Sequence, residues 1–180
     1  MYPKNYLEKF QQAANKLDKK LLDKNQLEVA VGLYASSVFL KLYKKSWANQ
    51  FQDPLTAESR IFFSIWINDS IIQEQKIFYN IHALKLRKLK GYSIESRKFA
   101  ESFRESFKRF EHQWQNVSTK FGPLTLMQGW VQVDPGNFNS EILQLANRFL
   151  KIDYLIDNNL DKFKQIKNKR TTNRTDNKKY

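Results

Sequence analysis

The chain has 180 residues, contains no cysteine and carries a net charge of +13. Its length suits a single domain with a tail, and the lack of cysteine excludes disulfides, thiolate metal sites and cysteine nucleophiles. The charge is uneven, because residues 85–120 carry a net charge of +6 and residues 162–180 carry a net charge of +7. Concentrated positive charge attracts polyanions, so the first expectation is a partner rich in phosphate groups.

The N-terminal residues lead directly into charged sequence and show no apolar signal core. The most apolar run, residues 29–40, is shorter than the ~20 residues that a membrane-spanning helix needs. We therefore expect a soluble, cytoplasmic protein without a transmembrane segment.

The first half of the chain suggests three helices. Apolar residues recur at spacings of three and four over residues 4–23, which predicts an amphipathic helix. Over residues 27–47 apolar side chains fall all around the helical wheel, which predicts a central helix. Asp53 and Pro54 read as an N-cap followed by proline in the first turn, so a long helix is expected to follow and to end at Gly91.

The second half contains the clearest helical pattern, over residues 94–118. One face of that helix would carry Phe99, Phe103, Phe107, Phe110, Trp114 and Val117. Residues 119–139 contain glycine and proline, and predict a long loop with a possible short β-hairpin at Gln128 and Gly129. A last helix is expected over residues 140–158. The predicted fold class is all-α, a single bundle of about five helices over residues 1–160, followed by a disordered basic tail over residues 161–180.

Basic residues lie opposite the phenylalanine stripe and just before it, where they could follow a phosphate backbone. The expected contacts are Lys85, Arg87, Lys88, Lys90, Arg97, Lys98, Arg104, Lys108 and Arg109. In the tail, the residues expected to strengthen association are Lys167, Lys169, Arg170 and Arg174. A competing interpretation is that the helical charges pair with glutamates three or four residues away on a solvated face. An AT-rich genome could also produce much of this lysine-rich composition.

Three aromatic residues lie outside the predicted helical stripes, and they are candidates for stacking on bases: Tyr92, Trp130 and Phe138. The two histidines, His82 and His112, have no companions at ligand spacing, and we expect both to be structural. No catalytic residues, metal site or cofactor are expected.

The segment Lys85-Leu-Arg-Lys-Leu-Lys90-Gly-Tyr92 leads into a basic, phenylalanine-rich stretch over residues 96–110. In size, charge and predicted helical architecture, the chain resembles the small helical subunits of CRISPR surveillance (Cascade-type) complexes. That resemblance implies basic helix faces along bound nucleic acid, several copies stacked on a filament, a role in antiviral defence and no catalysis.

The sequence thus predicts a non-catalytic subunit of a larger nucleoprotein complex, one that binds RNA, single-stranded DNA or duplex DNA through its phosphates without base specificity. Other protein subunits would be further partners. The main alternative is a protein-interaction adaptor, effector or inhibitor whose basic surface docks on an acidic protein. A third class is peripheral binding of the tail to an anionic membrane.

Overall fold

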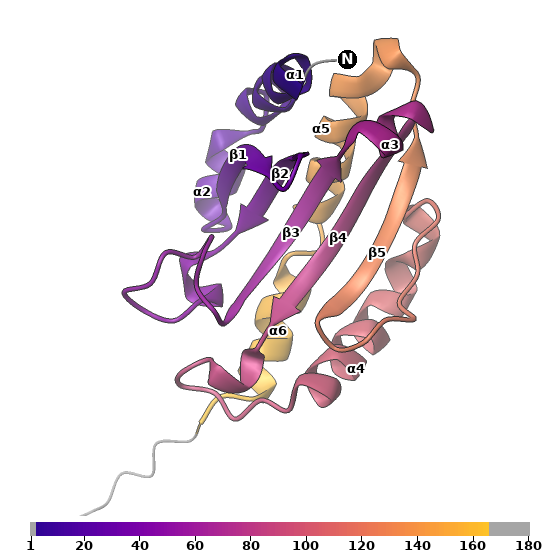
Figure 1. The fold of residues 1–180 in the computed structure, drawn as a ribbon. Helices are drawn as coiled ribbons and strands as arrows, with labels where there is room; N and C mark the ends of the chain where they lie inside the picture. The colour runs from indigo at the N-terminus through magenta and orange to yellow at the C-terminus, as the bar shows by residue number, and fades with distance from the viewer. Residues whose placement is uncertain (1–2, 166–180) are drawn as a thin grey trace, which may run out of the picture.

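The computed structural model describes residues 3–165 and contains a five-stranded antiparallel sheet with helices packed on one face (Figure 1). The predicted all-α helical bundle is therefore wrong, and the protein has a two-layer α/β fold. Part of the predicted basic tail, residues 166–180, lies outside the described residues.

The strands are neighbours in chain order, and each pairs antiparallel with the next. They are β1 (Glu28–Tyr34), β2 (Ser37–Tyr43), β3 (Arg60–Ile67), β4 (Lys76–Leu84) and β5 (Thr125–Gln132). The helices are α1 (Pro3–Asn15), α2 (Lys19–Lys24), α3 (Asp69–Gln73), α4 (Ser96–Phe107), α5 (Phe138–Phe149) and α6 (Tyr154–Lys162). Short 3-10 segments are η1 (Lys45–Trp47), η2 (Leu86–Lys88), η3 (Lys108–Gln113) and η4 (Pro135–Asn137).

The predicted central helix over residues 27–47 is instead the β1–β2 hairpin. Its turn consists of Ala35 and Ser36, whose φ angles of 45° and 65° match the backbone of a two-residue hairpin turn. In β2, Val38, Leu40 and Leu42 are buried while the residues between them are half-buried, which is the period of a strand.

The predicted long helix after Pro54 is replaced by β3, the short helix α3 and β4. The side chain of Asn68 caps α3, because its Oδ1 accepts a hydrogen bond from the backbone N–H of Ile71 at 3.0 Å. The predicted hairpin at Gln128 and Gly129 is also wrong, since β5 runs straight through both residues. A Cβ atom at Gly129 would lie 2.3 Å from the hydroxyl of Tyr79, so β5 needs glycine there.

The helices depart from the sequence expectations mainly at their ends. The first predicted helix is divided into α1 and α2, and the last into α5 and α6. The helix expected over residues 94–118 is confirmed as α4 continued by η3, and Phe99, Phe103 and Phe107 are buried as its stripe predicts.

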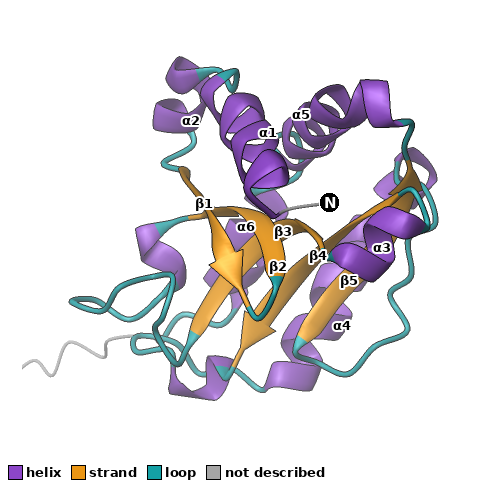
Figure 2. Ribbon diagram, turned by 45° about the horizontal axis from the view of Figure 1, so that its top comes forward, coloured by secondary structure: helices purple, strands orange, loops and turns teal. Residues whose placement is uncertain are grey.

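The main core lies between the sheet and the helices. The rings of Phe63 on β3 and Phe149 on α5 are stacked, with centroids 4.5 Å apart. Helix α1 packs against β1, β2 and α5, while α4 packs against β5 and α6. Figure 2 shows α1 and α5 on one side of the sheet and the β1–β2 hairpin curling toward the other side. No helix within residues 3–165 covers that other side, which we call the open face.

Candidate nucleic-acid interface on the open sheet face

Four aromatic side chains form a row across the open face. The strand register pairs Phe39 with Trp66, Trp66 with Phe78, and Phe78 with Trp130, so one aromatic residue from each of β2 to β5 lies in line. All four are half-buried, which leaves part of each side chain accessible. We call this row the aromatic ladder. Neighbouring strands are about 4.8 Å apart, so the ladder makes a continuous apolar strip.

Gly32 on β1 makes room at one end of the ladder. It pairs with Phe39, and a Cβ atom at this position would lie 2.9 Å from Cζ of the Phe39 ring. The ring of Phe39 therefore lies over the backbone of β1, and a larger residue at position 32 would make that ring shift.

A second row runs beside the ladder and is polar. The register places Lys41, Ser64, Asn80 and Gln128 in line on β2 to β5. We call it the polar row. On its far side lie Phe62 and His82, which are paired across β3 and β4, with ring centroids 5.4 Å apart.

Cations lie directly over the aromatic rings. Lys41 Nζ is 4.5 Å from the ring centroids of both Phe39 and Phe62, and the guanidinium carbon of Arg60 is 5.5 Å from Phe62. At the other end of the ladder, Lys76 Nζ is 4.5 Å from the ring of Trp130. These are cation–π distances, and they hold positive charge close to the apolar strip.

The positive charge at Lys41 is not neutralised by the protein. Within residues 3–165 no carboxylate pairs with Lys41, whereas Lys76 pairs with Glu74 at 2.7 Å. Burial, and then the nearby charge of Arg60, lower the pKa of Lys41. Two neighbouring cations, with Asp53 as the one acidic side chain of the described residues that lines the same hollow, favour an anionic ligand.

The face is hollowed into a groove of about 750 Å³. The tip of the β1–β2 hairpin forms one wall with Leu33, Tyr34 and Ser37, and the loop before β3 contributes Asp53, Leu55 and Thr56. The remaining lining residues are Phe39, Lys41, Arg60, Phe62, Ser64, Trp66, Asn80, His82 and Gln128. A volume of this size is typical of a ligand site, and Asp53 is the one carboxylate among the described residues that line it.

His82 is held in one orientation on this face. Its Nδ1 lies 3.2 Å from the carbonyl oxygen of Leu124, which can only accept, so Nδ1 carries the proton in that contact. Burial lowers the pKa of His82, and the charges of Lys41 and Arg60 lower it further, against the opposing effect of the Leu124 carbonyl. His82 therefore favours its neutral form at neutral pH.

The basic residues predicted from the sequence are scattered. Lys85 and Lys88 both contact Glu58, at 2.6 and 2.9 Å, and their hydrogen bonds lower the pKa of that carboxyl group to about 2. Lys98 pairs with Glu95 at 2.7 Å. The predicted residues whose side chains are exposed and form no hydrogen bond or ion pair in the described part of the chain are Arg87, Lys90, Arg97 and Lys108.

Arg104 and Arg109 have structural contacts instead of free guanidinium groups. Arg104 donates hydrogen bonds to the carbonyl oxygens of Phe121, Gly122, Thr125 and Leu126 at 2.9–3.1 Å. Arg109 donates to the hydroxyl of Tyr154 at 3.0 Å. Since α4 packs on the helix side of the sheet, its basic residues and the open face do not form one surface.

Of the three predicted stacking residues, Trp130 lies in the aromatic ladder. Tyr92 is half-buried and its backbone bridges to Lys164, while Phe138 is 4% exposed and packs against Tyr6 and Phe10. Phe138 is thus a core residue with no face free for a base. The predicted tail contacts Lys167, Lys169, Arg170 and Arg174 lie outside the described residues.

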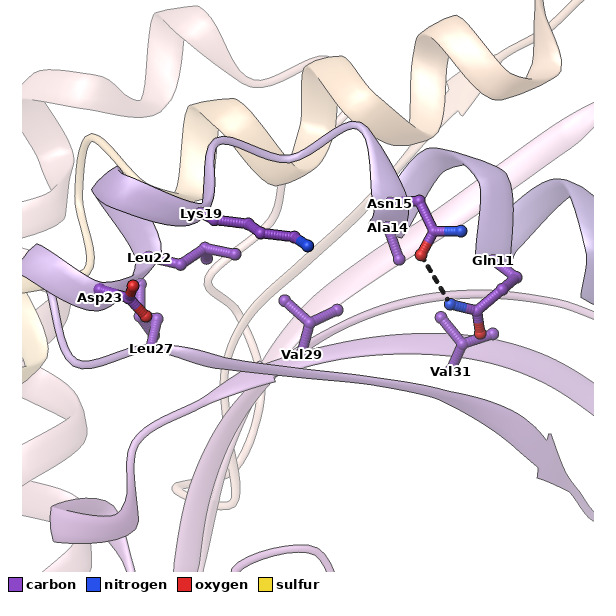
Figure 3. A pocket seen from close by; sticks show the side chains of 9 residues that line it. All are labelled: Gln11, Ala14, Asn15, Lys19, Leu22, Asp23, Leu27, Val29 and Val31. Atoms are coloured by element: carbon purple, nitrogen blue, oxygen red, sulfur yellow. Dashed lines mark hydrogen bonds between the residues drawn. The ribbon is translucent and has the colours of Figure 1, made fainter.

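A second, smaller hollow of about 330 Å³ lies between α1, α2 and the edge strand β1 (Figure 3). Its walls mix apolar residues, such as Val29 and Val31, with Lys19 and with a Gln11–Asn15 hydrogen bond of 3.1 Å. It has no set of groups that converge on one point. Among residues 3–165 no group of three or more histidine or acidic side chains could hold a metal ion.

In comparisons with known proteins, no family model, curated protein or solved structure matches the chain. The fold and the open face define the class, a two-layer α/β protein with an uncovered antiparallel sheet. None of the helices in the described residues is long and apolar enough to span a membrane. The all-helical architecture that resembled the CRISPR subunits is absent, so that resemblance no longer supports a role.

Proposed function

We propose that the protein binds single-stranded nucleic acid on the open face of its sheet, without catalysing a reaction. The observation that carries the proposal is the aromatic ladder of Phe39, Trp66, Phe78 and Trp130, with cations 4.5 Å from its rings at both ends. Bases stack on aromatic side chains while nearby lysine and arginine residues contact phosphates, and the open face offers both kinds of group.

The ligand is single-stranded for a geometric reason. A base can stack on a protein ring only when its own face is free, and in a duplex that face is covered by the next base pair. The ladder crosses four strands, so a chain of unstacked bases could lie along it. The sequence predicted phosphate contacts on residues 85–109; in this proposal Lys41, Arg60 and Lys76 take that role.

A half-buried apolar strip alone would also suit a protein partner. Charge argues for nucleic acid, because the chain carries a net +13 and the groove has two basic side chains against one acidic. Partly accessible aromatic rings beside basic side chains are characteristic of single-strand binding. The alternative of a protein adaptor becomes the stronger one if no nucleic acid binds.

Fluorescence polarisation tests the proposal with labelled ten-nucleotide RNA and DNA strands and a duplex of the same sequence, across a salt series. We expect the full chain to bind single strands more tightly than the duplex, with affinity that falls as salt rises. Lys41→Gln should weaken binding, while Lys108→Gln, an equal change of charge on η3, should have a much smaller effect. No binding at low salt by folded protein, or a loss confined to the Lys108 variant, would overturn the proposal.

A further inference from the structure

The polar row contains hydrogen-bonding groups that the protein itself does not use. Asn80 is 3% exposed, yet its carboxamide makes no hydrogen bond within residues 3–165, and its Oδ1 is buried without a partner. On either side, the side chains of Ser64 and Gln128 also form no hydrogen bond in the described part of the chain. Buried polar atoms in folded proteins are nearly always paired, so the unpaired Oδ1 of Asn80, with two further unpaired polar side chains beside it on the neighbouring strands, indicates that a ligand supplies the partners.

Asn80 has the central position in this arrangement. It lies on β4 between Ser64 and Gln128, lines the groove, and is flanked along its own strand by Phe78 and His82 on the same face. Side chains stand roughly perpendicular to a sheet. A base lying on the ring of Phe78 or Trp66 would therefore present its edge to the carboxamide in the neighbouring row.

We infer that the polar row reads the edge of a stacked base and that the preferred base is adenine. This inference rests on the proposed function. A carboxamide offers one acceptor and one pair of donor hydrogens, and adenine matches it with the N6 amino group as donor and N7 as acceptor. Adenine also presents a purine face, which covers more of the ladder than a pyrimidine.

The two rows then have separate tasks. Lys41 has donors only and pairs with no carboxylate of the described residues, so it contacts phosphate and contributes affinity that depends on salt. Asn80 is uncharged and contributes discrimination between bases, which does not depend on salt. Binding is thus selective for sequence, in contrast to the charge-only binding that the sequence suggested.

The experiment compares ten-nucleotide RNA strands of adenosine with strands of purine riboside, which keep the purine ring but lack the N6 amino group. We expect the full chain to bind the adenosine strand at least about fivefold more tightly, the lower limit for a well-formed bidentate contact. Asn80→Ala should reduce that ratio to about one. Lys41→Gln, the matched control, should weaken both complexes and keep the ratio. Thermal unfolding verifies that each variant is folded.

Three results are decisive against the inference. Equal, salt-dependent binding of both strands by the unmodified protein would refute base reading and leave the proposed function intact. A ratio that persists in Asn80→Ala would refute the role of Asn80. Failure to bind any single strand would refute the proposed function together with the inference.

Discussion

The ammonium group of Lys41 lies 4.5 Å from the ring centroid of Phe62, and this pair forms the centre of positive charge on the open face. Phe62 is only 6% exposed, so the lysine lies on the ring at the surface of the sheet. Arg60 approaches the same ring at 5.5 Å, which places two cations on one aromatic side chain. That concentration of charge is suited to a phosphate group.

Replacing Lys41 by glutamine should remove one phosphate contact. For single strands each contact contributes about 0.7 to the slope of log affinity against log salt, so the slope should become shallower by about that amount. Polarisation titrations at several salt concentrations measure it. An unchanged slope would show that Lys41 does not contact phosphate.

Trp66, near the end of β3, belongs to the ladder and also lines the groove, as Phe39 does on β2. Trp66→Leu keeps an apolar side chain in the sheet but removes the ring. One base stacked on an aromatic side chain is worth about 1–3 kcal/mol, so affinity for a single strand should fall by roughly 5- to 150-fold. Phe121→Leu, on a ring that is 38% exposed outside the groove, is the matched control and should leave affinity unchanged.

The same rings explain why the sequence suggested helices where strands exist. In β3 the core face carries Ile61, Phe63 and Ile65, and the open face carries Phe62 and Trp66. Apolar side chains on both faces erase the alternation that identifies a half-exposed strand. The features that define the candidate site therefore concealed the fold around it.

Helix α4 could be predicted because it has one apolar face and one charged face. Phe99, Phe103 and Phe107 recur every four residues on one buried face, and the other face is charged. The turn between β1 and β2 gave no comparable signal, since Ala35 and Ser36 adopt positive φ without glycine or asparagine. The ladder itself depends on register between distant strands, which no local pattern specifies.

Arg104 shows that a count of charged residues does not tell which of them are free to bind a ligand. It was expected at phosphates, but it holds the loop before β5 through the carbonyl groups of Phe121, Gly122, Thr125 and Leu126. Arg104→Lys cannot reproduce the planar fork that reaches several carbonyls, so the free energy of unfolding should fall by about 2 kcal/mol or more. Arg97→Lys, at an exposed position without a partner in the described residues, should change it by less than about 0.5 kcal/mol.

Urea unfolding measures both variants, and polarisation at a temperature where they remain folded completes the test. Arg104→Lys should bind single strands like the unmodified protein. A loss of affinity in the folded variant would restore Arg104 as a contact to nucleic acid.

His82 should make stability depend on pH between about 7 and 5. Burial lowers its pKa in the folded protein, while in the unfolded chain it takes up a proton near pH 6.5. As pH falls through that value the unfolded state gains protons that the folded state resists, so stability is complete above about 6.5 and decreases below it. Lys41 and Arg60 face the imidazole and strengthen this effect.

Thermal unfolding at pH 7 and pH 5 measures the decrease, which His82→Gln should reduce. Protonation of Glu58 does not affect this comparison. The pKa of its carboxyl group is lowered to about 2, so the stability that its contacts with lysine contribute is lost only below about pH 4.5. His112→Gln, at an exposed position on η3, is the matched control. An identical pH dependence in the His82 variant and the unmodified protein would contradict the prediction.

Asn80 should lower the stability of the free protein, because its Oδ1 is buried without a hydrogen-bond partner among the described residues. Leaving such a group without hydrogen bonds costs about 1–3 kcal/mol, and valine has a similar size and suits a strand. Asn80→Val should therefore raise the free energy of unfolding by about 1 kcal/mol in urea unfolding, while selectivity for adenine is lost. A residue that lowers stability but supports binding is typical of a ligand-binding site and not of a hydrophobic core.

Asn159 is the control for this prediction, because it is a buried asparagine whose carboxamide is hydrogen-bonded at both its nitrogen and its oxygen. It is equally buried, but its Nδ2 donates to the carbonyl oxygen of Leu155 at 2.7 Å and its Oδ1 accepts from Ser102 and Lys162. Asn159→Val removes these bonds and should lower the free energy of unfolding by about 1–3 kcal/mol. Opposite changes in the free energy of unfolding for the two substitutions would show that the Asn80 carboxamide is unpaired in the free protein and available to a ligand. A loss of stability in both would mean that Asn80 is satisfied in the folded protein, by water or by a rearranged side chain, and that its place in the groove is structural.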